Sequence, residues 1–212
     1  SDVCSSDLAA MAIKNLVLDM GNVLLSWTPM AFAQRAAENE EDAVILNSAL
    51  FDTPEWGMID AGQIDEAALL RLSLARTPKR LHDALRVLLA QWPGWMVPIP
   101  GAEVFTRKAR EMGLKLYLLS NAGKRFPAVL ETQPFYPRFE GMMVSAHEKV
   151  TKPDPRIYHL LCERFSLLPR ECLFVDDVAE NVTAAERVGM SAVLFEGDYR
   201  KVEEKLRELG LS

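Results

Sequence analysis

The sequence has few cysteines, no excess of basic residues and no long apolar run. Its three cysteines, Cys4, Cys162 and Cys172, are odd in number and lack the spacing of a metal site. Lys and Arg number 24 against 30 Asp and Glu, which gives a formal net charge of −6. No apolar run approaches the roughly 18–20 residues that a membrane-spanning helix needs. We therefore expect reduced thiols, a cytoplasmic location, and neither a nucleic-acid nor a membrane partner.

The first ten residues, SDVCSSDLAA, also lack the features of a targeting segment. They contain neither the basic region nor the apolar region of a secretory signal, and they follow no periodic pattern. We expect residues 1–10 to be a disordered leader or an artefact that takes no part in the fold.

Short apolar segments alternate with helical patterns along most of the chain. Alternation of this kind predicts a parallel sheet with helices on both faces, a three-layer α/β core of the Rossmann-like type. The predicted strands are Asn15–Asp19, Leu114–Ser120, Met142–Ala146, Leu173–Asp177 and Ser191–Phe195, and the predicted helices between them include Ala102–Met112, Pro155–Phe165 and Ala179–Val188.

One long segment, residues 29–95, departs from this alternation because its periodicity is helical throughout. A Pro- and Gly-rich stretch, QWPGWMVPIPGAE, then returns the chain to the α/β pattern. We predict a Rossmann-like core made of residues 11–28 and 96–212, with residues 29–95 inserted as a helical cap. Such a cap would lie over the C-terminal end of the first strand.

Polar residues stand where several predicted strands end, and ligands of open parallel sheets bind at that edge. Asp19 ends the first strand, where a buried carboxylate is costly unless it is paired or coordinated. Ser120 and Asn121 end the second, where a hydroxyl and backbone N–H groups can hold a phosphate. Each feature taken alone has an ordinary explanation as a turn.

Two further features follow the third and fourth strands. In TKPDPRIY, two prolines hold Lys152 in a stiff segment before a helix, although a lone lysine is more often solvated. In LFVDDVAEN, the adjacent acids Asp176 and Asp177 repel each other, and a divalent cation would relieve that repulsion. An acidic helix N-terminus explains the same pair without a metal.

Taken together, these motifs in this order resemble the haloacid dehalogenase-like hydrolase superfamily, most of whose members are phosphatases. The implied class is subfamily I, which carries a small helical C1 cap after the first strand. The forms DMGNVLL, LLSNAG, KPDPRIY and FVDDVAENVTAAERVGM, with PEWGMIDAGQIDEAAL in the cap, are most similar to the branch that includes alpha-D-glucose-1-phosphatase.

The resemblance implies a role for each of these positions. Asp19 would be the nucleophile that attacks phosphorus and forms an aspartyl-phosphate. Mg²⁺ would be held by Asp19, the backbone carbonyl of Gly21 and Asp177, with Asp176 as an alternative to its neighbour. Ser120, the backbone N–H of Asn121 and Lys152 would bind the transferring phosphoryl oxygens.

Gly21 departs from the wider superfamily, in which most phosphatases have an aspartate that protonates the leaving group. Glycine keeps the backbone carbonyl, so the implied metal contact is retained. General acid catalysis contributes typically about 10²–10⁴-fold, so its loss predicts a slow enzyme or a good leaving group. The glucose-1-phosphatase-like branch has the same glycine, and an anomeric sugar oxygen is a comparatively good leaving group.

We therefore expect a Mg²⁺-dependent phosphatase that acts on a small phosphorylated metabolite, with a sugar phosphate as one candidate. Two alternatives stay open. A 2-haloacid dehalogenase would share the nucleophilic aspartate and need no metal, and a catalytically silent protein would only bind a phosphorylated ligand. The sequence does not indicate an oligomeric state.

Overall fold

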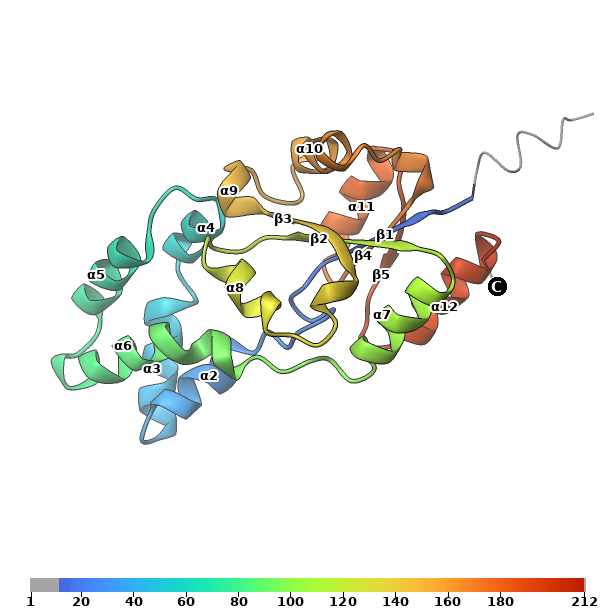
Figure 1. The fold of residues 1–212 in the computed structure, drawn as a ribbon. Coiled ribbons are helices and arrows are strands. Elements are labelled where there is room, and N and C mark those ends of the chain that lie inside the picture. The colour runs from blue at the N-terminus through green and yellow to red at the C-terminus, as the bar shows by residue number, and fades with distance from the viewer. Residues whose placement is uncertain (1–11, 212) are drawn as a thin grey trace, which may run out of the picture.

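A five-stranded parallel sheet forms the centre of the molecule (Figure 1). The computed structural model describes residues 12–211, so the predicted leader at 1–10 lies outside the described residues. The strand order is β3-β2-β1-β4-β5, and every neighbouring pair runs parallel. The strands are β1 (Asn15–Leu18), β2 (Lys115–Ser120), β3 (Phe139–Val144), β4 (Cys172–Asp176) and β5 (Ser191–Leu194). The predicted α/β class is confirmed.

The third strand differs most from its predicted bounds. It begins at Phe139, before the predicted start at Met142, and it ends at Val144. Ser145 and Ala146 open a short helix, α9 (Ser145–Glu148), rather than extending the strand. The reason is a hydrogen bond between distant segments, because the hydroxyl of Ser145 accepts from the backbone N–H of Ala122, just after β2, and turns the chain toward that strand.

Alternate residues of each strand pack into two separate apolar cores, because successive side chains in a strand point to opposite faces of the sheet. In β1, Leu16 and Leu18 belong to one core and Val17 to the other. The first core includes α7 (Ala102–Glu111) and α12 (Tyr199–Glu208), and the second includes α10 (Pro155–Phe165) and α11 (Ala179–Arg187). Figure 1 shows these helix pairs on opposite sides of the sheet.

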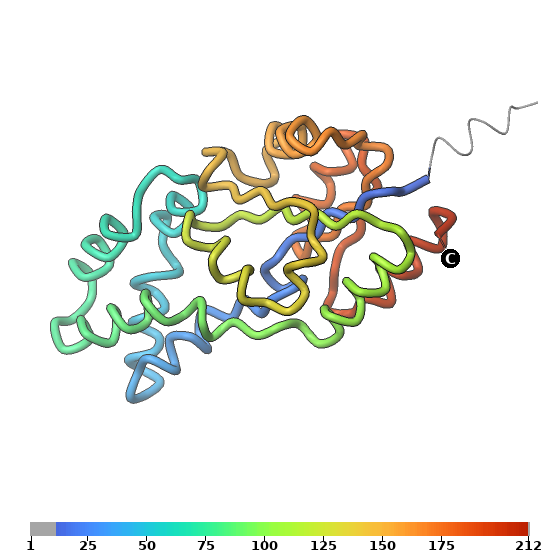
Figure 2. Tube along the Cα trace, viewed as in Figure 1, coloured from blue at the N-terminus to red at the C-terminus, as the bar shows by residue number. Residues whose placement is uncertain are grey.

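Residues 29–95 contain helices and no strand. Figure 2 shows this part of the chain gathered at one end of the molecule, away from the end where the C-terminus lies. The elements are α2 (Pro29–Ala36), α3 (Glu40–Leu50), α4 (Pro54–Asp60), α5 (Glu66–Arg76), η1 (Lys79–Leu81), α6 (His82–Gln91) and η2 (Trp92–Trp95). Their apolar side chains continue the first core. The division into a core domain and a cap domain stays a prediction.

The remaining elements are short and lie near β3 and β4. They are α8 (Phe126–Glu131), η3 (Tyr136–Arg138) and η4 (Pro169–Glu171). Cys162 and Cys172 are buried and carry free thiols, whereas Cys4 lies outside the described residues. Among the helices of residues 12–211, none combines the length and the apolarity needed to cross a bilayer.

Candidate active site

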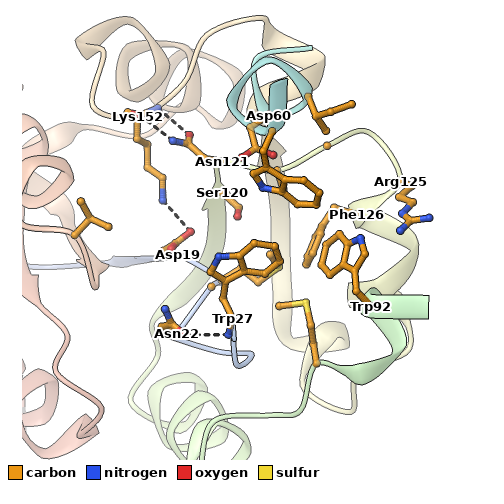
Figure 3. Close-up of a pocket in the computed structure, with 18 of the residues that line it drawn as sticks. Asp19, Asn22, Trp27, Asp60, Trp92, Ser120, Asn121, Arg125, Phe126 and Lys152 are labelled. Carbon is orange, nitrogen blue, oxygen red and sulfur yellow. Dashed lines mark hydrogen bonds and ion pairs between the residues drawn. The ribbon is translucent and has the colours of Figure 1, made fainter. Parts of the chain in front are cut away.

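The polar strand ends predicted from the sequence meet in one cavity (Figure 3). The central strand β1 pairs with β2 on one side and β4 on the other, so the carboxyl ends of all three lie together. The chain reverses its direction of strand addition between β1 and β4, which is where open α/β sheets bind ligands. The predicted site residues that line the cavity are Asp19, Gly21, Ser120, Asn121, Lys152 and Asp177.

Lys152 stands between two carboxylates at the base of this cavity. Its ammonium nitrogen lies 2.8 Å from Asp19 Oδ1 and 2.6 Å from Asp176 Oδ2. It also donates to the backbone carbonyl of Leu119, at 3.0 Å. The Lys152 side chain is only 1% exposed, so the two acids and these hydrogen bonds take the place of its water shell.

The side chain of Asn121 fixes the backbone of Lys152. Its amide donates to the carbonyl of Lys152 at 2.9 Å, and its oxygen accepts from the N–H of Lys152 at 2.8 Å. The predicted phosphate contact of Asn121 used its backbone N–H and stays a prediction. The structure shows a second role for this residue, because the two hydrogen bonds of its side-chain amide hold Lys152 beside Asp19.

The adjacent acids of the fourth strand differ in their surroundings. Asp176 is fully buried, and its Oδ1 accepts from the backbone N–H of Val178 and the side chain of Asn181. Its Oδ2 accepts a hydrogen bond from the ammonium of Lys152. Asp177 lies on the cavity wall and accepts one hydrogen bond, at 3.0 Å, from Asn22. Asp177 is therefore the acid of this pair with more freedom to bind a ligand.

Three carboxylates come close enough to share one cation. One oxygen from each of Asp19, Asp176 and Asp177 lies within 4.8 Å of the others. Hard cations such as Mg²⁺ prefer carboxylate and carbonyl oxygens, so the donor set fits the predicted metal. Gly21 contributes its backbone to the same cavity wall.

Burial and charge both act on the acids of this cluster. The pKa of Asp19 is raised to about 7, because burial and the charge of Asp176 together outweigh the opposing ammonium of Lys152. Burial also raises the pKa of Asp177. Burial works against the charge of Lys152, but Asp19 and Asp176 outweigh it and raise the pKa of that lysine. A cation bound here would favour the ionised carboxylates.

The whole cavity has a volume of about 270 Å³, and away from the carboxylates its lining is largely apolar. Trp27 stacks on Trp56 with ring centroids 5.5 Å apart, and it meets Trp92 edge to face at 5.1 Å. These tryptophans therefore pack against one another and also line the cavity. The apolar lining comes from several elements and includes Trp27, Trp56, Leu69, Leu89, Trp92 and Phe126.

Sequence reasoning missed two features of the cavity wall. Arg125 and Glu66 form an ion pair with 2.7 Å between Nε and Oε1. Asp60, the last residue of α4, lines the cavity beside Ile59. Burial, with a smaller effect of the charge on Asp19, raises the pKa of Asp60 to about 7. A helical pattern alone does not show which cap residue turns toward the sheet, so no sequence signal selected Asp60.

Comparison with known proteins places these motifs in a family. The family model described as haloacid dehalogenase-like hydrolase matches residues 13–189. A sesquiterpene phosphatase from Aspergillus oryzae is 26% identical over 84% of this chain and 87% of its own length. A glyceraldehyde 3-phosphate phosphatase from Pyrococcus abyssi is 30% identical over 60% of this chain, which spans 54% of that protein. Three further curated relatives are matched over less than half of their length.

Solved structures show the same fold. A haloacid dehalogenase-family enzyme from Bacteroides thetaiotaomicron superposes with a TM-score of 0.71 at 22% identity, covering 90% of this chain and 99% of that one. That structure carries an Asp-to-Ala substitution and holds magnesium and inorganic phosphate. The L-2-haloacid dehalogenase of Xanthobacter autotrophicus superposes with a TM-score of 0.65 at 19% identity, over 94% of this chain and 84% of its own.

Proposed function

This chain belongs to the haloacid dehalogenase-like hydrolase family, and we propose that it hydrolyses a small phosphomonoester with Mg²⁺ through an aspartyl-phosphate on Asp19. It is a hydrolase of the phosphatase type, which the family and the named phosphatase relatives support. One observation supports the finer proposal above all others. The ammonium of Lys152 lies 2.8 Å from Asp19, in a cluster of three carboxylates able to share a cation.

Charge neutralisation explains why these residues stand together. A carboxylate nucleophile and a phosphate dianion repel each other, and Lys152 offsets that repulsion at the point of attack. A Mg²⁺ ion held by Asp19, the carbonyl of Gly21 and Asp177 would supply further positive charge to the transferring phosphoryl oxygens. Asp176 keeps Lys152 in place, and Asn121 fixes the lysine backbone. Ser120 lines the cavity, where its hydroxyl would donate to phosphate.

The leaving group would occupy the aromatic part of the cavity. Trp27, Trp56 and Trp92 offer ring faces and few hydrogen-bonding groups. A polyol bound there would lose hydrogen bonds to water that these side chains do not replace, and each loss is costly. The lining therefore favours an alcohol with a large apolar surface. The predicted sugar phosphate and the likeness to the glucose-1-phosphatase branch stay predictions, as does a cytoplasmic location.

A substrate panel tests this proposal. We expect Mg²⁺-dependent phosphate release from 4-nitrophenyl phosphate, and a higher kcat/KM for phenethyl phosphate than for glucose 1-phosphate. Asp19→Asn should abolish release from all three, because the amide is not a nucleophile for phosphorus. A chelator should reduce the wild-type rate to background.

The same panel separates the two alternatives. Chloride release from 2-chloropropionate without Mg²⁺, and no phosphate release, would indicate a dehalogenase. Binding of phosphate esters without turnover by the Mg²⁺-loaded protein would indicate a silent binding protein. Either result would overturn the phosphatase proposal.

A further inference from the structure

One carboxyl group in the cavity, that of Asp60, has no side-chain partner among the described residues. Four acidic residues line the cavity, and three have a side-chain partner. The carboxyl group of Asp60 makes no hydrogen bond or ion pair with any residue between 12 and 211. The three others are Asp19, which pairs with Lys152, Asp177, which accepts from Asn22, and Glu66, which pairs with Arg125.

The surroundings of Asp60 favour its protonated form. It is the last residue of α4, and a helix C-terminus carries partial negative charge that disfavours a carboxylate. Asp60 and Asp19 approach the cavity from different sides in Figure 3, with Ser120 between them in that view. The charged residues that line the same cavity or lie on the packed helix α9 are Asp19, Glu66, Arg125, Lys152, Asp177, His147 and Glu148, the last of which pairs with Arg164.

The core fixes the position of Asp60. Its backbone carbonyl accepts a 2.5 Å hydrogen bond from the hydroxyl of Ser145, in α9. The same hydroxyl accepts from the N–H of Ala122, two residues after Ser120. Gly62 sits so close to α9 that a Cβ atom there would lie 2.2 Å from the carbonyl oxygen of Ala146. The end of α4 is thus held against the strand ends that carry the reacting groups.

Most phosphatases of this superfamily have a proton-donating aspartate at the position of Gly21. Apart from Asp60, none of the described residues of the cavity is placed to donate that proton. Gly21 has no side chain, and the ammonium of Lys152 is engaged by two carboxylates and a carbonyl. Arg125 remains charged at any ordinary pH. Glu66 is ion-paired with that arginine. Asp177 accepts from Asn22 and belongs to the carboxylate cluster proposed to hold Mg²⁺. A leaving alkoxide needs a proton at neutral pH, and the free carboxyl of Asp60 is the remaining donor.

We propose that Asp60 is the acid–base residue of this site, an inference that rests on the proposed phosphatase function. As Asp19 attacks phosphorus and the bond to the leaving oxygen breaks, the carboxylic acid of Asp60 donates its proton to that oxygen. The alcohol leaves. The carboxylate of Asp60 then takes a proton from water as the water oxygen bonds to phosphorus. The bond between Asp19 and phosphorus breaks, which releases phosphate and restores the protonated Asp60.

The acidity of Asp60 suits both steps. Burial and the nearby charge of Asp19 raise the pKa of Asp60 to about 7, so at neutral pH both protonation states are populated. General acids and bases work best when their pKa lies near the operating pH. The protonated form is required for alcohol release, so the rate on a poor leaving group should fall as pH rises above about 7.

Comparison of a poor and a good leaving group tests the proposal. Asp60→Asn keeps the shape of the side chain and removes the proton donor. In the Mg²⁺-loaded enzyme, we expect it to lower kcat/KM, which reports the steps through alcohol release, by about 10²–10⁴-fold on phenethyl phosphate. On 4-nitrophenyl phosphate the phenolate leaves without a proton, so the loss should stay below about tenfold. Asp83→Asn is the matched control, since the Asp83 side chain is 101% exposed on α6.

The pH profile gives a second readout. Wild-type kcat/KM on phenethyl phosphate should decline above about pH 7, and Asp60→Asn should lose that decline. Equal losses of kcat/KM on both substrates, or no loss on either, would overturn the role of Asp60 as the acid of alcohol release. A wild-type enzyme that releases no phosphate from 4-nitrophenyl phosphate would instead overturn the proposed function, so the two failures are distinguishable.

Discussion

At the scale of single residues, the charge balance of the site depends on Lys152. Its ammonium is the only positive group described within hydrogen-bonding distance of Asp19 and Asp176. All three residues are buried. Removing one partner from a buried ion pair leaves an uncompensated buried charge. This destabilises a protein more than replacing the whole pair by apolar residues does.

Lys152→Met should therefore affect both stability and activity. We expect the free energy of unfolding to fall by about 3–5 kcal/mol, because Asp19 and Asp176 would face each other without a cation. Phosphate release should be abolished. Urea denaturation without Mg²⁺ measures the first effect, and the 4-nitrophenyl phosphate assay measures the second.

Arg156→Met is the control for Lys152→Met. Arg156 pairs with Asp154, but its side chain is 77% exposed. Exposed pairs contribute little because water screens them. An equal loss of stability in the two variants would show that the contribution of Lys152 to the free energy of unfolding does not depend on its burial.

At the scale of elements, the sequence predicted the parts of the site that follow strands. Asp19, Ser120 and Asp177 follow apolar, β-branched segments, and parallel strands bring their carboxyl ends to one edge. The predicted strand bounds were accurate to within one residue at four of the five strands. The third strand was misplaced because its first residues, FEG, carry no clear alternation and Ser145 starts a helix.

The residues of segment 29–95 that line the cavity could not be predicted in the same way. Residues 29–95 were recognised as helical, but helix periodicity gives no information on how helices of a separate layer face the sheet. Asp60 reaches the cavity because Ser145 bonds its carbonyl and Gly62 permits close contact with α9. Both contacts join segments far apart in the sequence.

Gly62→Ala tests this contact between α4 and α9. Gly62 has φ +64°, where a side chain costs about 1–2 kcal/mol, and its Cβ would overlap the carbonyl of Ala146. We expect lower thermal stability and displacement of Asp60. The loss of kcat/KM should be at least about tenfold on phenethyl phosphate and smaller on 4-nitrophenyl phosphate.

Gly57→Ala, inside α4 itself, is the matched control. A Cβ atom at Gly57 meets nothing within 4 Å, so the substitution should leave activity unchanged. It should stabilise the helix by roughly 0.5–1 kcal/mol, because alanine restricts the unfolded chain. If Gly62→Ala behaves like Gly57→Ala, the approach of α4 to α9 does not position Asp60.

At the scale of the whole molecule, the sheet and the helical segment share one apolar core. The first core runs from Leu16 and Leu18 of β1 to Phe32 and Leu46 in the helical segment. The charged cluster lies on the cavity between these parts. A ligand that binds only the folded cluster therefore stabilises the complete structure.

Mg²⁺ should raise the melting temperature. At a concentration of about 100 times Kd the expected gain is about 2.7 kcal/mol. For a chain of 212 residues this corresponds to a shift of roughly 5–10 °C. Asp177→Asn should reduce the shift, whereas Asp83→Asn should not. Differential scanning calorimetry measures both, and an undiminished shift in Asp177→Asn would place the metal elsewhere.

The most direct test of the central claim is detection of the phosphoryl group on Asp19. The Mg²⁺-loaded enzyme is mixed with radiolabelled 4-nitrophenyl phosphate, quenched in acid within its first turnover and mapped by mass spectrometry. We predict label on the peptide that contains Asp19, released by hydroxylamine as expected of an acyl phosphate and absent in Asp19→Asn. Phosphate release in that first turnover without labelled Asp19, or label on a different residue, would contradict the account.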